Sequence, residues 1–128
     1  MTQPESFRFP VSEMRAERTA SGFAALLREE GDSIRRDVFT MIEPDQSASG
    51  RIQAGYTTIY PGCVTRGHTH PDREEVYYFT RGQGQMVADG TETVVVAGDT
   101  FYLEPGPFHI ARNTGDLPFE YFWITIRT

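Results

Sequence analysis

Short segments of β-forming residues, divided by glycine and proline turns at close intervals, are the feature that most restricts the fold of this chain. Turn sequences recur every 8–20 residues from Pro61 onward, at 61–62, 81–84, 89–90, 97–99 and 105–107. This spacing is typical of an all-β sandwich or barrel. Threonine, isoleucine, valine and aromatic residues dominate the intervening segments, and these residues favour strands. We therefore expect strands at 34–42, 51–60, 76–80, 85–88, 91–96, 100–103, 109–113 and 119–127.

The N-terminal part of the chain has a different pattern. Residues 1–20 are polar overall and predict either an edge strand laid on a neighbour or a loose arm. Ser21 fits the N-cap of a short helix over 21–30, in which Phe23, Leu26 and Leu27 share one face. A chain of 128 residues suits one domain. We expect an arm, a short helix and a first strand over 1–50 to pack on a barrel formed by 51–128.

The C-terminal segment 119–126 carries apolar residues on both faces of its predicted strand. One face should pack on the core, and the other needs a cover, because large apolar surfaces are rarely left exposed. A second copy of the chain would provide that cover, which predicts a homodimer. The helix at 21–30 or the N-terminal arm is the alternative cover within one chain.

The composition excludes several classes of partner and reaction. The chain carries 12 basic and 18 acidic residues, and the basic ones are spread along it, so nucleic acid is not an expected partner. All the basic residues are arginines, which excludes a lysine Schiff base or a lysine general base. Cys63 is the single cysteine, and the sequence shows neither a leader-like start nor an apolar run long enough to span a bilayer. We therefore expect a cytoplasmic protein that does not enter a membrane.

Three histidines carry the strongest chemical signal in the sequence. His68 and His70 are two residues apart, so on an extended strand both imidazoles point to one face. Glu75 opens the next predicted strand, where its carboxylate can lie beside the two rings, and His109 lies on a later strand. Three neutral imidazoles and one carboxylate suit iron, manganese, nickel, cobalt, copper or zinc. In a six-coordinate ion this set leaves two positions open, whereas it would close four-coordinate zinc. We expect one divalent transition metal ion, with iron or manganese favoured.

The spacing of these residues resembles the two sequence motifs of the cupin superfamily. The first motif is reproduced by Gly62, five residues, His68-Thr69-His70, four residues, Glu75, six residues and Gly82. The second motif reads Gly98, five residues, Glu104-Pro105-Gly106, two residues, His109, three residues and Asn113. It differs from the family pattern in Glu104, with the proline displaced to Pro105. The resemblance spans roughly 51–126. It implies a small jelly-roll β-barrel with His68, His70, Glu75 and His109 as metal ligands in its mouth.

Strand alternation extends the candidate site beyond the metal ligands. If Glu75 points inward, Tyr77 does too, which makes Tyr77 the candidate acid/base or metal-supporting hydroxyl. Counting back by two from His68 places Arg66 near the mouth, where a guanidinium could bind a carboxylate or phosphate. An exposed arginine at a strand edge is the alternative for Arg66.

The register of the strand before the first motif is left open by Gly55. Either Tyr56 and Thr58 or Thr57 and Ile59 face the interior, and we favour Tyr56 and Thr58. A mostly aromatic interior with a few polar groups would suit a small-molecule substrate or ligand.

Resemblance to this superfamily does not by itself name a reaction, because one barrel hosts many enzyme classes and non-catalytic binding proteins. The ligand set favours a metal-dependent enzyme, a dioxygenase-like oxidoreductase acting on a small oxygenated molecule. The chain also resembles archaeal-type cupin phosphoglucose isomerases in three short segments. These are Thr65-Arg66-Gly67-His68-Thr69-His70, Glu75-Val76-Tyr77-Tyr78 and Gly82-Gln83-Gly84. That likeness implies a sugar or sugar-phosphate isomerase as an alternative, and binding or sensing without turnover is a third. A sugar epimerase of this barrel family is disfavoured, because it needs a histidine that is free to act as a base.

Overall fold

The computed structural model describes residues 4–13 and 36–128. Residues 36–128 form strands β1 (Arg36–Ile42), β2 (Ile52–Ile59), β3 (Arg73–Arg81), β4 (Gln83–Ala88), β5 (Thr91–Val96), β6 (Thr100–Leu103), β7 (His109–Asn113) and β8 (Phe119–Arg127). The helical elements of these described ranges are two 3-10 turns, η1 (Val11–Glu13) and η2 (Pro44–Gln46). Neither has the length and apolar character needed to cross a bilayer. The helix expected at 21–30 lies outside the described residues, and the N-terminal helical element that is described is only the turn η1.

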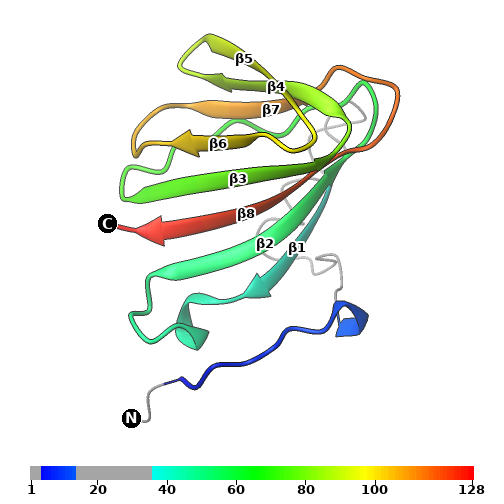
Figure 1. Ribbon diagram of the computed structural model, residues 1–128. Helices are drawn as coiled ribbons and strands as arrows, with labels where there is room; N and C mark the ends of the chain where they lie inside the picture. The colour runs from blue at the N-terminus through cyan, green and yellow to red at the C-terminus, as the bar shows by residue number, and fades with distance from the viewer. Residues whose placement is uncertain (1–3, 14–35) are drawn as a thin grey trace.

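The strands form two antiparallel sheets that enclose the core between them. The larger sheet has the order β1-β2-β8-β3-β6, and the smaller has the order β5-β4-β7. Figure 1 shows the smaller sheet as a layer against one end of the curved larger sheet. Consecutive strands such as β3 and β4 lie in different sheets, so the chain passes back and forth between the layers. The all-β jelly-roll fold expected from the sequence is confirmed.

Most strand ends lie within two residues of the positions expected from the sequence. The exception is β3, which begins at Arg73, three residues before its predicted start. This early start follows from pairing with the long C-terminal strand, because Arg73 lies opposite Arg127 and Glu75 lies opposite Thr125. The same pairing sets which residues of β3 face the interior.

An aromatic cluster fills the interior at the later part of β3. The rings of Phe79 and Phe119 stack with centroids 5.2 Å apart, and Tyr121 packs edge-on against Phe79 at 5.5 Å. Met86 and Val95 meet this cluster from the smaller sheet. Stacked and edge-to-face pairs of this kind add to the stabilisation from burial alone. Glu75 and Tyr77 precede the cluster on β3, so the candidate site lies beyond it, toward the start of that strand.

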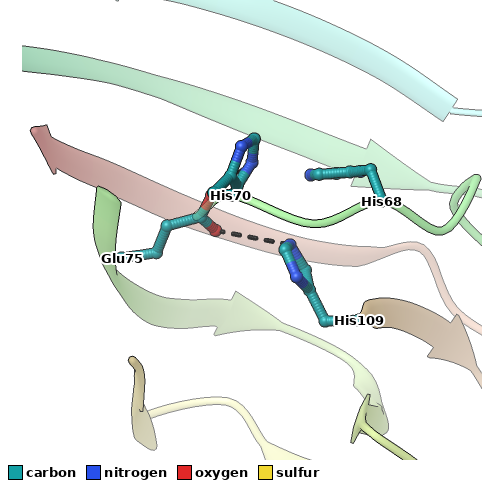
Figure 2. A group of neighbouring side chains, drawn as sticks. All are labelled: His68, His70, Glu75 and His109. Atoms are coloured by element: carbon teal, nitrogen blue, oxygen red, sulfur yellow. Dashed lines mark ion pairs between the residues drawn. The ribbon is translucent and has the colours of Figure 1, made fainter. Parts of the chain in front are cut away.

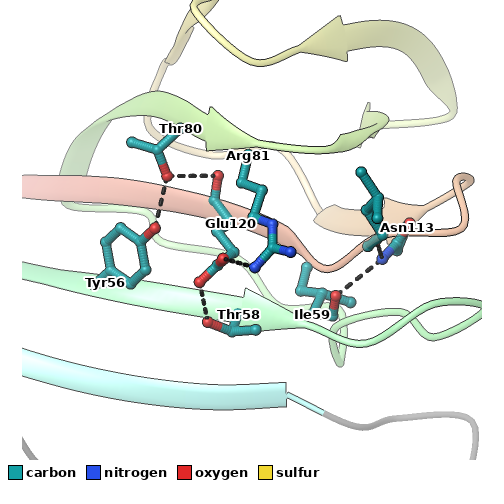
Figure 3. A network of polar contacts seen from close by, with 8 residues as sticks. Tyr56, Thr58, Ile59, Thr80, Arg81, Asn113 and Glu120 are labelled. Carbon is teal, nitrogen blue, oxygen red and sulfur yellow. Dashed lines mark hydrogen bonds and ion pairs between the residues drawn. The ribbon is translucent and has the colours of Figure 1, made fainter.

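The side chain of Asn113, at the end of β7, ties separate backbone segments together. Its Nδ2 donates to the carbonyl oxygens of Ile59 and Leu117, each at 2.9 Å, and its Oδ1 accepts from the amide of Gly115 at 2.9 Å. Asn113 is 3% exposed. It therefore holds the β7–β8 turn against the end of β2, a contact visible in Figure 3.

A polar network links β2, β3 and β8 on the outer face of the larger sheet (Figure 3). Tyr56 Oη and Thr80 Oγ1 lie 2.7 Å apart, and Thr58 Oγ1 donates to the Glu120 carboxylate at 2.8 Å. Arg81 Nη1 lies 3.5 Å from the same carboxylate. These contacts hold the side chains of Tyr56 and Thr58 on the outside of the barrel.

The outward side of β8 carries the half-buried residues Phe122, Ile124 and Ile126. They alternate with Tyr121 and Thr125, which point into the barrel and are buried. The homodimer expected to cover this face stays a prediction.

Candidate metal centre

Two candidate ligands lie on the connection 61–72, between β2 and β3, which is held against β7. His68 forms an isolated antiparallel bridge with His109. The His109 amide donates to the His68 carbonyl at 3.0 Å, and the His68 amide donates to the His109 carbonyl at 3.3 Å. Further along, the Gly106 amide donates to the His70 carbonyl at 3.0 Å. These bonds bring together histidines that are far apart in the sequence.

Glu75 reaches the same point from β3, in the other sheet. Each of the four side chains offers one ligand atom, and these atoms all lie within 4.8 Å of one another. Glu75 Oε1 is 2.8 Å from His70 Nε2, and Glu75 Oε2 is 3.8 Å from His109 Nε2. Figure 2 shows the side chains converging from separate segments. The four residues proposed from the sequence as metal ligands, His68, His70, Glu75 and His109, therefore meet in space.

Backbone carbonyl groups orient two of the imidazoles. His68 Nδ1 lies 3.2 Å from the Arg66 carbonyl oxygen, and His109 Nδ1 lies 3.2 Å from the Pro107 carbonyl oxygen. A carbonyl oxygen can only accept a hydrogen bond, so each Nδ1 carries the proton and each Nε2 keeps its lone pair. Hydrogen bonds of this kind commonly fix the tautomer of metal-binding histidines.

The surroundings favour neutral imidazoles and an ionised carboxylate. Burial, reinforced by the neighbouring histidines, lowers the pKa of His68 to about 4. Burial also lowers the pKa of His109. For Glu75 burial acts to raise the pKa, but hydrogen bonds from His70 and Tyr77 outweigh it and hold the pKa below its ordinary value. Neutral imidazole and ionised carboxylate are the forms that bind metal ions.

The buried Nε2 atom of His109 tests whether the cluster suits a metal ion. Within the described residues this atom has no hydrogen-bond partner, and His109 is 4% exposed. An unsatisfied buried nitrogen costs free energy, which coordination to a cation would offset. Three imidazoles and a carboxylate also match the donor preferences of divalent transition metals. The residues present therefore fit one such ion.

Tyr77 lies directly beside the cluster. It is 5% exposed, and its hydroxyl donates a hydrogen bond to Glu75 Oε2. Burial raises the pKa of Tyr77 well above its ordinary value, so the phenol stays protonated at neutral pH. The inward orientation expected for Tyr77 from strand alternation is confirmed, and the phenol orients one oxygen of the carboxylate.

The cluster forms part of a cavity between the sheets, with a volume of about 280 Å³. The charged residues of its described lining are Arg36, Arg73 and Glu75. The other lining residues are Val38, Thr40, Gln53, Thr57, Thr65, His68, His70, Tyr77, Met86, His109, Ala111, Tyr121, Trp123 and Thr125. Apolar walls with a few convergent polar groups are typical of small-molecule sites.

Trp123 forms one wall of the cavity, and Gly55 makes room for its ring. The indole Nε1 donates to Thr57 Oγ1 at 3.0 Å. A Cβ atom at position 55 would overlap both the Trp123 indole and the carbonyl oxygen of Phe39. The position of the ring therefore requires glycine at this point of β2.

The register favoured for β2 from the sequence is wrong. Thr57 and Ile59 point inward, at 4% and 0% exposure, whereas Tyr56 and Thr58 join the outer network. Gly55 carries no side chain to mark its face, so the alternation gave two equal solutions. The large Trp123 ring on the neighbouring strand decides between them.

Arg66 is exposed and does not belong to the described cavity lining. Counting by two from His68 fails because the connection 61–72 contains only isolated bridges and no regular strand. Gly67, against which the Phe108 ring packs, interrupts the alternation. Thr65 takes the inward position, and its hydroxyl accepts from the Ala111 amide at 2.8 Å.

Two other arginines line the cavity and were missed in the sequence. Arg36 shares a side of β1 with the lining residues Val38 and Thr40, and Arg73 precedes Glu75 by two on β3. The same alternation that pointed to Tyr77 could have found Arg73. Arg36 could not be placed in the cavity from the sequence, because its position depends on the pairing of β1 with β2 at the edge of the sheet.

Comparisons with known proteins agree with this geometry. A family model described as a cupin domain matches residues 55–125. One curated relative is the glucose-6-phosphate isomerase of Thermococcus litoralis, 33% identical over 104 residues, which are 71% of this chain and 54% of that protein. Another is the oxalate-binding protein of Thermotoga maritima, 30% identical over 66 residues, which are 52% of this chain and 54% of that protein. The chain spans about half the length of these relatives.

Solved structures show the same architecture. A structure described as a predicted oxalate decarboxylase from Thermotoga maritima has a TM-score of 0.76 and 20% identity, covering 95% of this chain and 100% of its own. A Klebsiella pneumoniae protein with a double-stranded β-helix domain has a TM-score of 0.64 and 21% identity, covering 74% and 84%. At these identities the likeness shows the shared fold.

Proposed function

The chain belongs to the cupin family, and we propose that it is a metal-dependent cupin that binds a small, oxygen-rich molecule at an ion held by His68, His70, Glu75 and His109. The observation that carries this proposal is the convergence of the four ligand atoms, within 4.8 Å of one another, in the wall of a cavity of about 280 Å³. Backbone carbonyls already hold the protons of His68 and His109 on Nδ1, so the Nε2 atom of each ring keeps a lone pair for the ion.

The donor set supports an ion that retains open positions. Four protein ligands leave two sites free in an octahedral ion such as iron or manganese. When bound, such an ion would polarise an oxygen atom of the ligand or, as iron or manganese, exchange electrons with it.

The chain's own residues hold and orient this site. Tyr77 donates to Glu75 Oε2 and so limits rotation of the carboxylate. The carbonyls of Arg66 and Pro107 keep the protons of His68 and His109 on Nδ1. We assign Tyr77 as a positioning residue, because its raised pKa makes it a hydrogen-bond donor and a poor base at neutral pH.

For the reaction, we propose isomerisation of a sugar or sugar phosphate. Support comes from relatives named as glucose-6-phosphate isomerases, including those of Thermococcus litoralis and Thermococcus onnurineus. The second candidate is the dioxygenase-like oxidoreductase expected from the ligand set, which the two open positions favour. The relative named as an oxalate-binding protein supports the non-catalytic alternative.

The metal proposal is tested by elemental analysis of protein purified without chelators or a histidine tag, followed by titration with Mn²⁺, Fe²⁺ and Zn²⁺. We expect one ion per chain. Glu75→Gln should lose most of the bound metal, because it removes the only anionic ligand among the four. Glu74→Gln is the matched control, since Glu74 is half-buried on the opposite side of β3 from Glu75, where its carboxylate accepts from the Tyr102 hydroxyl at 2.7 Å. Equal metal content in both variants would refute the proposed ligand set.

The reaction class is tested on the metal-loaded chain with two assays. Interconversion of aldose and ketose phosphates, followed by NMR, reports isomerisation. Oxygen consumption with enediols, flavonoids and thiols reports dioxygenase chemistry. Activity in the first assay alone supports the isomerase, activity in the second alone supports the oxidoreductase, and ligand binding without turnover in either assay supports the binding protein.

A further inference from the structure

Phe108 is a large apolar side chain that lies beside the candidate metal centre without being buried in the core. Its side chain is 54% exposed, although it comes directly before the candidate ligand His109. The ring packs against Gly67, which comes directly before the candidate ligand His68, and a Cβ atom at position 67 would meet this ring first. Phe108 therefore joins the two chain segments that lead into His68 and His109.

These two segments orient their imidazoles in the same way. In each, the ring Nδ1 lies 3.2 Å from the carbonyl oxygen of the residue two positions earlier. The residue between that carbonyl and the histidine is Gly67 in the first segment and Phe108 in the second. Movement of either residue would change how the carbonyl meets the ring. Such hydrogen bonds determine which ring nitrogen keeps the lone pair, so the contact between Gly67 and Phe108 bears on both ligands.

Asp89, in the tight turn between β4 and β5, holds the backbone of Phe108. Its Oδ1 accepts from the Phe108 amide at 2.8 Å, and its own amide donates to the Phe108 carbonyl at 2.8 Å. Asp89 has a φ of 47° and is, among the described residues, the only one other than glycine with a positive φ. Two-residue turns of this kind need positive φ, which glycine adopts most easily. Aspartate adds an acceptor that glycine lacks, and this acceptor meets the residue before His109.

A second aspartate makes the same pair of hydrogen bonds away from the candidate ligands. Asp99 Oδ2 accepts from the Val96 amide at 2.9 Å, and the Asp99 amide donates to the Val96 carbonyl at 3.0 Å. These bonds join residues three positions apart and close the turn between β5 and β6, whereas the bonds of Asp89 reach a residue 19 positions away. Asp89 thus connects its turn to a distant segment, and that segment carries a candidate ligand.

We propose that Phe108 and Asp89 are positioning residues for the metal centre. Asp89 fixes the backbone of Phe108, and the Phe108 ring, packed on Gly67, holds the segment before His68 relative to the segment before His109. Together they set the relation between two imidazoles whose ring centroids lie 4.4 Å apart. The effect on the ion rests on the proposed function, whereas the effect on the two imidazoles does not need an ion.

The first experiment uses the metal-free chain. Imidazole ¹⁵N–¹H correlation spectra at neutral pH distinguish a proton on Nδ1 from a proton on Nε2. We expect Nδ1–H at His68 and His109 in the wild-type chain. Phe108→Ala should shift a measurable fraction of both rings to Nε2–H. Leu117→Ala is the matched control, because it shortens a similarly exposed side chain, at 56%, on the β7–β8 turn. Equal spectra for wild type and Phe108→Ala would overturn the proposal.

The second experiment measures Co²⁺ affinity and the visible spectrum of bound Co²⁺, which reports ligand geometry. Phe108→Ala and Gly67→Ala should each weaken binding by about 10-fold or more and change the spectrum. Gly67 does not have a positive φ, so the Phe108 ring is the first obstacle to alanine there. The double variant should therefore bind no more weakly than Phe108→Ala alone. Losses that simply add would contradict the contact between the two residues.

The third experiment separates the Asp89 side chain from its backbone conformation. Asp89→Asn keeps an acceptor and tolerates the positive φ, so Co²⁺ affinity should stay within about 2-fold of the wild type. Asp89→Gly keeps the backbone but loses the acceptor, and it should weaken binding by about 3- to 10-fold, the range for one hydrogen bond. Asp99→Gly is the matched control and should leave Co²⁺ affinity unchanged. Equal losses in the two glycine variants would refute the role of Asp89.

The outcomes separate this inference from the proposed function. Absence of Co²⁺ binding by the wild-type chain would refute the metal site, and the spectra of the metal-free chain would still decide the role of Phe108. Normal Co²⁺ binding by the wild-type chain, with the same affinity in Phe108→Ala and Asp89→Gly, would overturn the positioning role alone.

Discussion

Asn113→Ala tests how strongly one buried side chain holds the β7–β8 turn to β2. The substitution leaves the buried carbonyl of Ile59 without the amide that it accepts from at 2.9 Å, which costs about 1–3 kcal/mol. The bonds to Leu117 and Gly115 are partly buried, so water can replace them, at roughly 0.5 kcal/mol each. The free energy of unfolding should therefore fall by about 2–4 kcal/mol, and the melting temperature by roughly 8–16 °C.

Urea denaturation followed by tryptophan fluorescence measures this loss. Trp123 is the single tryptophan of the chain, and it forms part of the cavity wall, so its emission reports on the barrel interior. Thr58→Val is the control: it removes one partly buried hydrogen bond on the outer face and should cost less than about 1 kcal/mol. A loss for Asn113→Ala no larger than that of the control, with an unchanged dependence on urea, would refute the assigned role.

Three further predictions concern the metal centre. His109→Ala should lower metal affinity by at least about 10–100-fold, the scale seen even for residues that only support a ligand, and unchanged affinity in a metal titration would contradict the assignment. Tyr77→Phe should keep the metal stoichiometry and lower turnover, because Glu75 loses its orienting hydrogen bond; equal turnover would leave Tyr77 a packing role alone. The metal-free chain should lose stability in acid: burial lowers the pKa of His68 to about 4, against about 6.5 unfolded, so the stabilisation is present above pH 6.5 and is lost as the pH falls toward 4. Urea midpoints that do not change between pH 7 and pH 4 would contradict this.

The strands and the four candidate ligands could be predicted from the sequence because both depend on local patterns. Glycine and proline turns bound short β-rich segments, and the observed strands follow them closely. The spacing of His68, His70 and Glu75, together with His109 after a second turn, was sufficient to name the residues that converge. Tyr77 followed from alternation on β3, because this strand is paired without a register shift on both sides from Glu75 to Tyr78.

The remaining features of the cavity could not be predicted, because they depend on contacts that the alternation of residues along a strand does not describe. Arg66 was placed by counting through 61–72, where Gly67 breaks the two-residue period. The register of β2 depended on the Trp123 ring, which belongs to a strand far along the chain. Arg36 enters the cavity because β1 joins the sheet edge, a matter of topology. Packing between distant segments decided each of these cases.

The absence of a side chain at Gly55 has a consequence for the size of molecule that the barrel can admit. This residue contributes no atom to the cavity lining, yet it provides the space that the Trp123 indole occupies over β2. Any bulk gained there would tilt the indole toward the interior and shorten the chamber, with the metal-ligand cluster untouched. The length of the cavity and the position of the candidate ligands are thus set by different strands, and a change in one need not disturb the other.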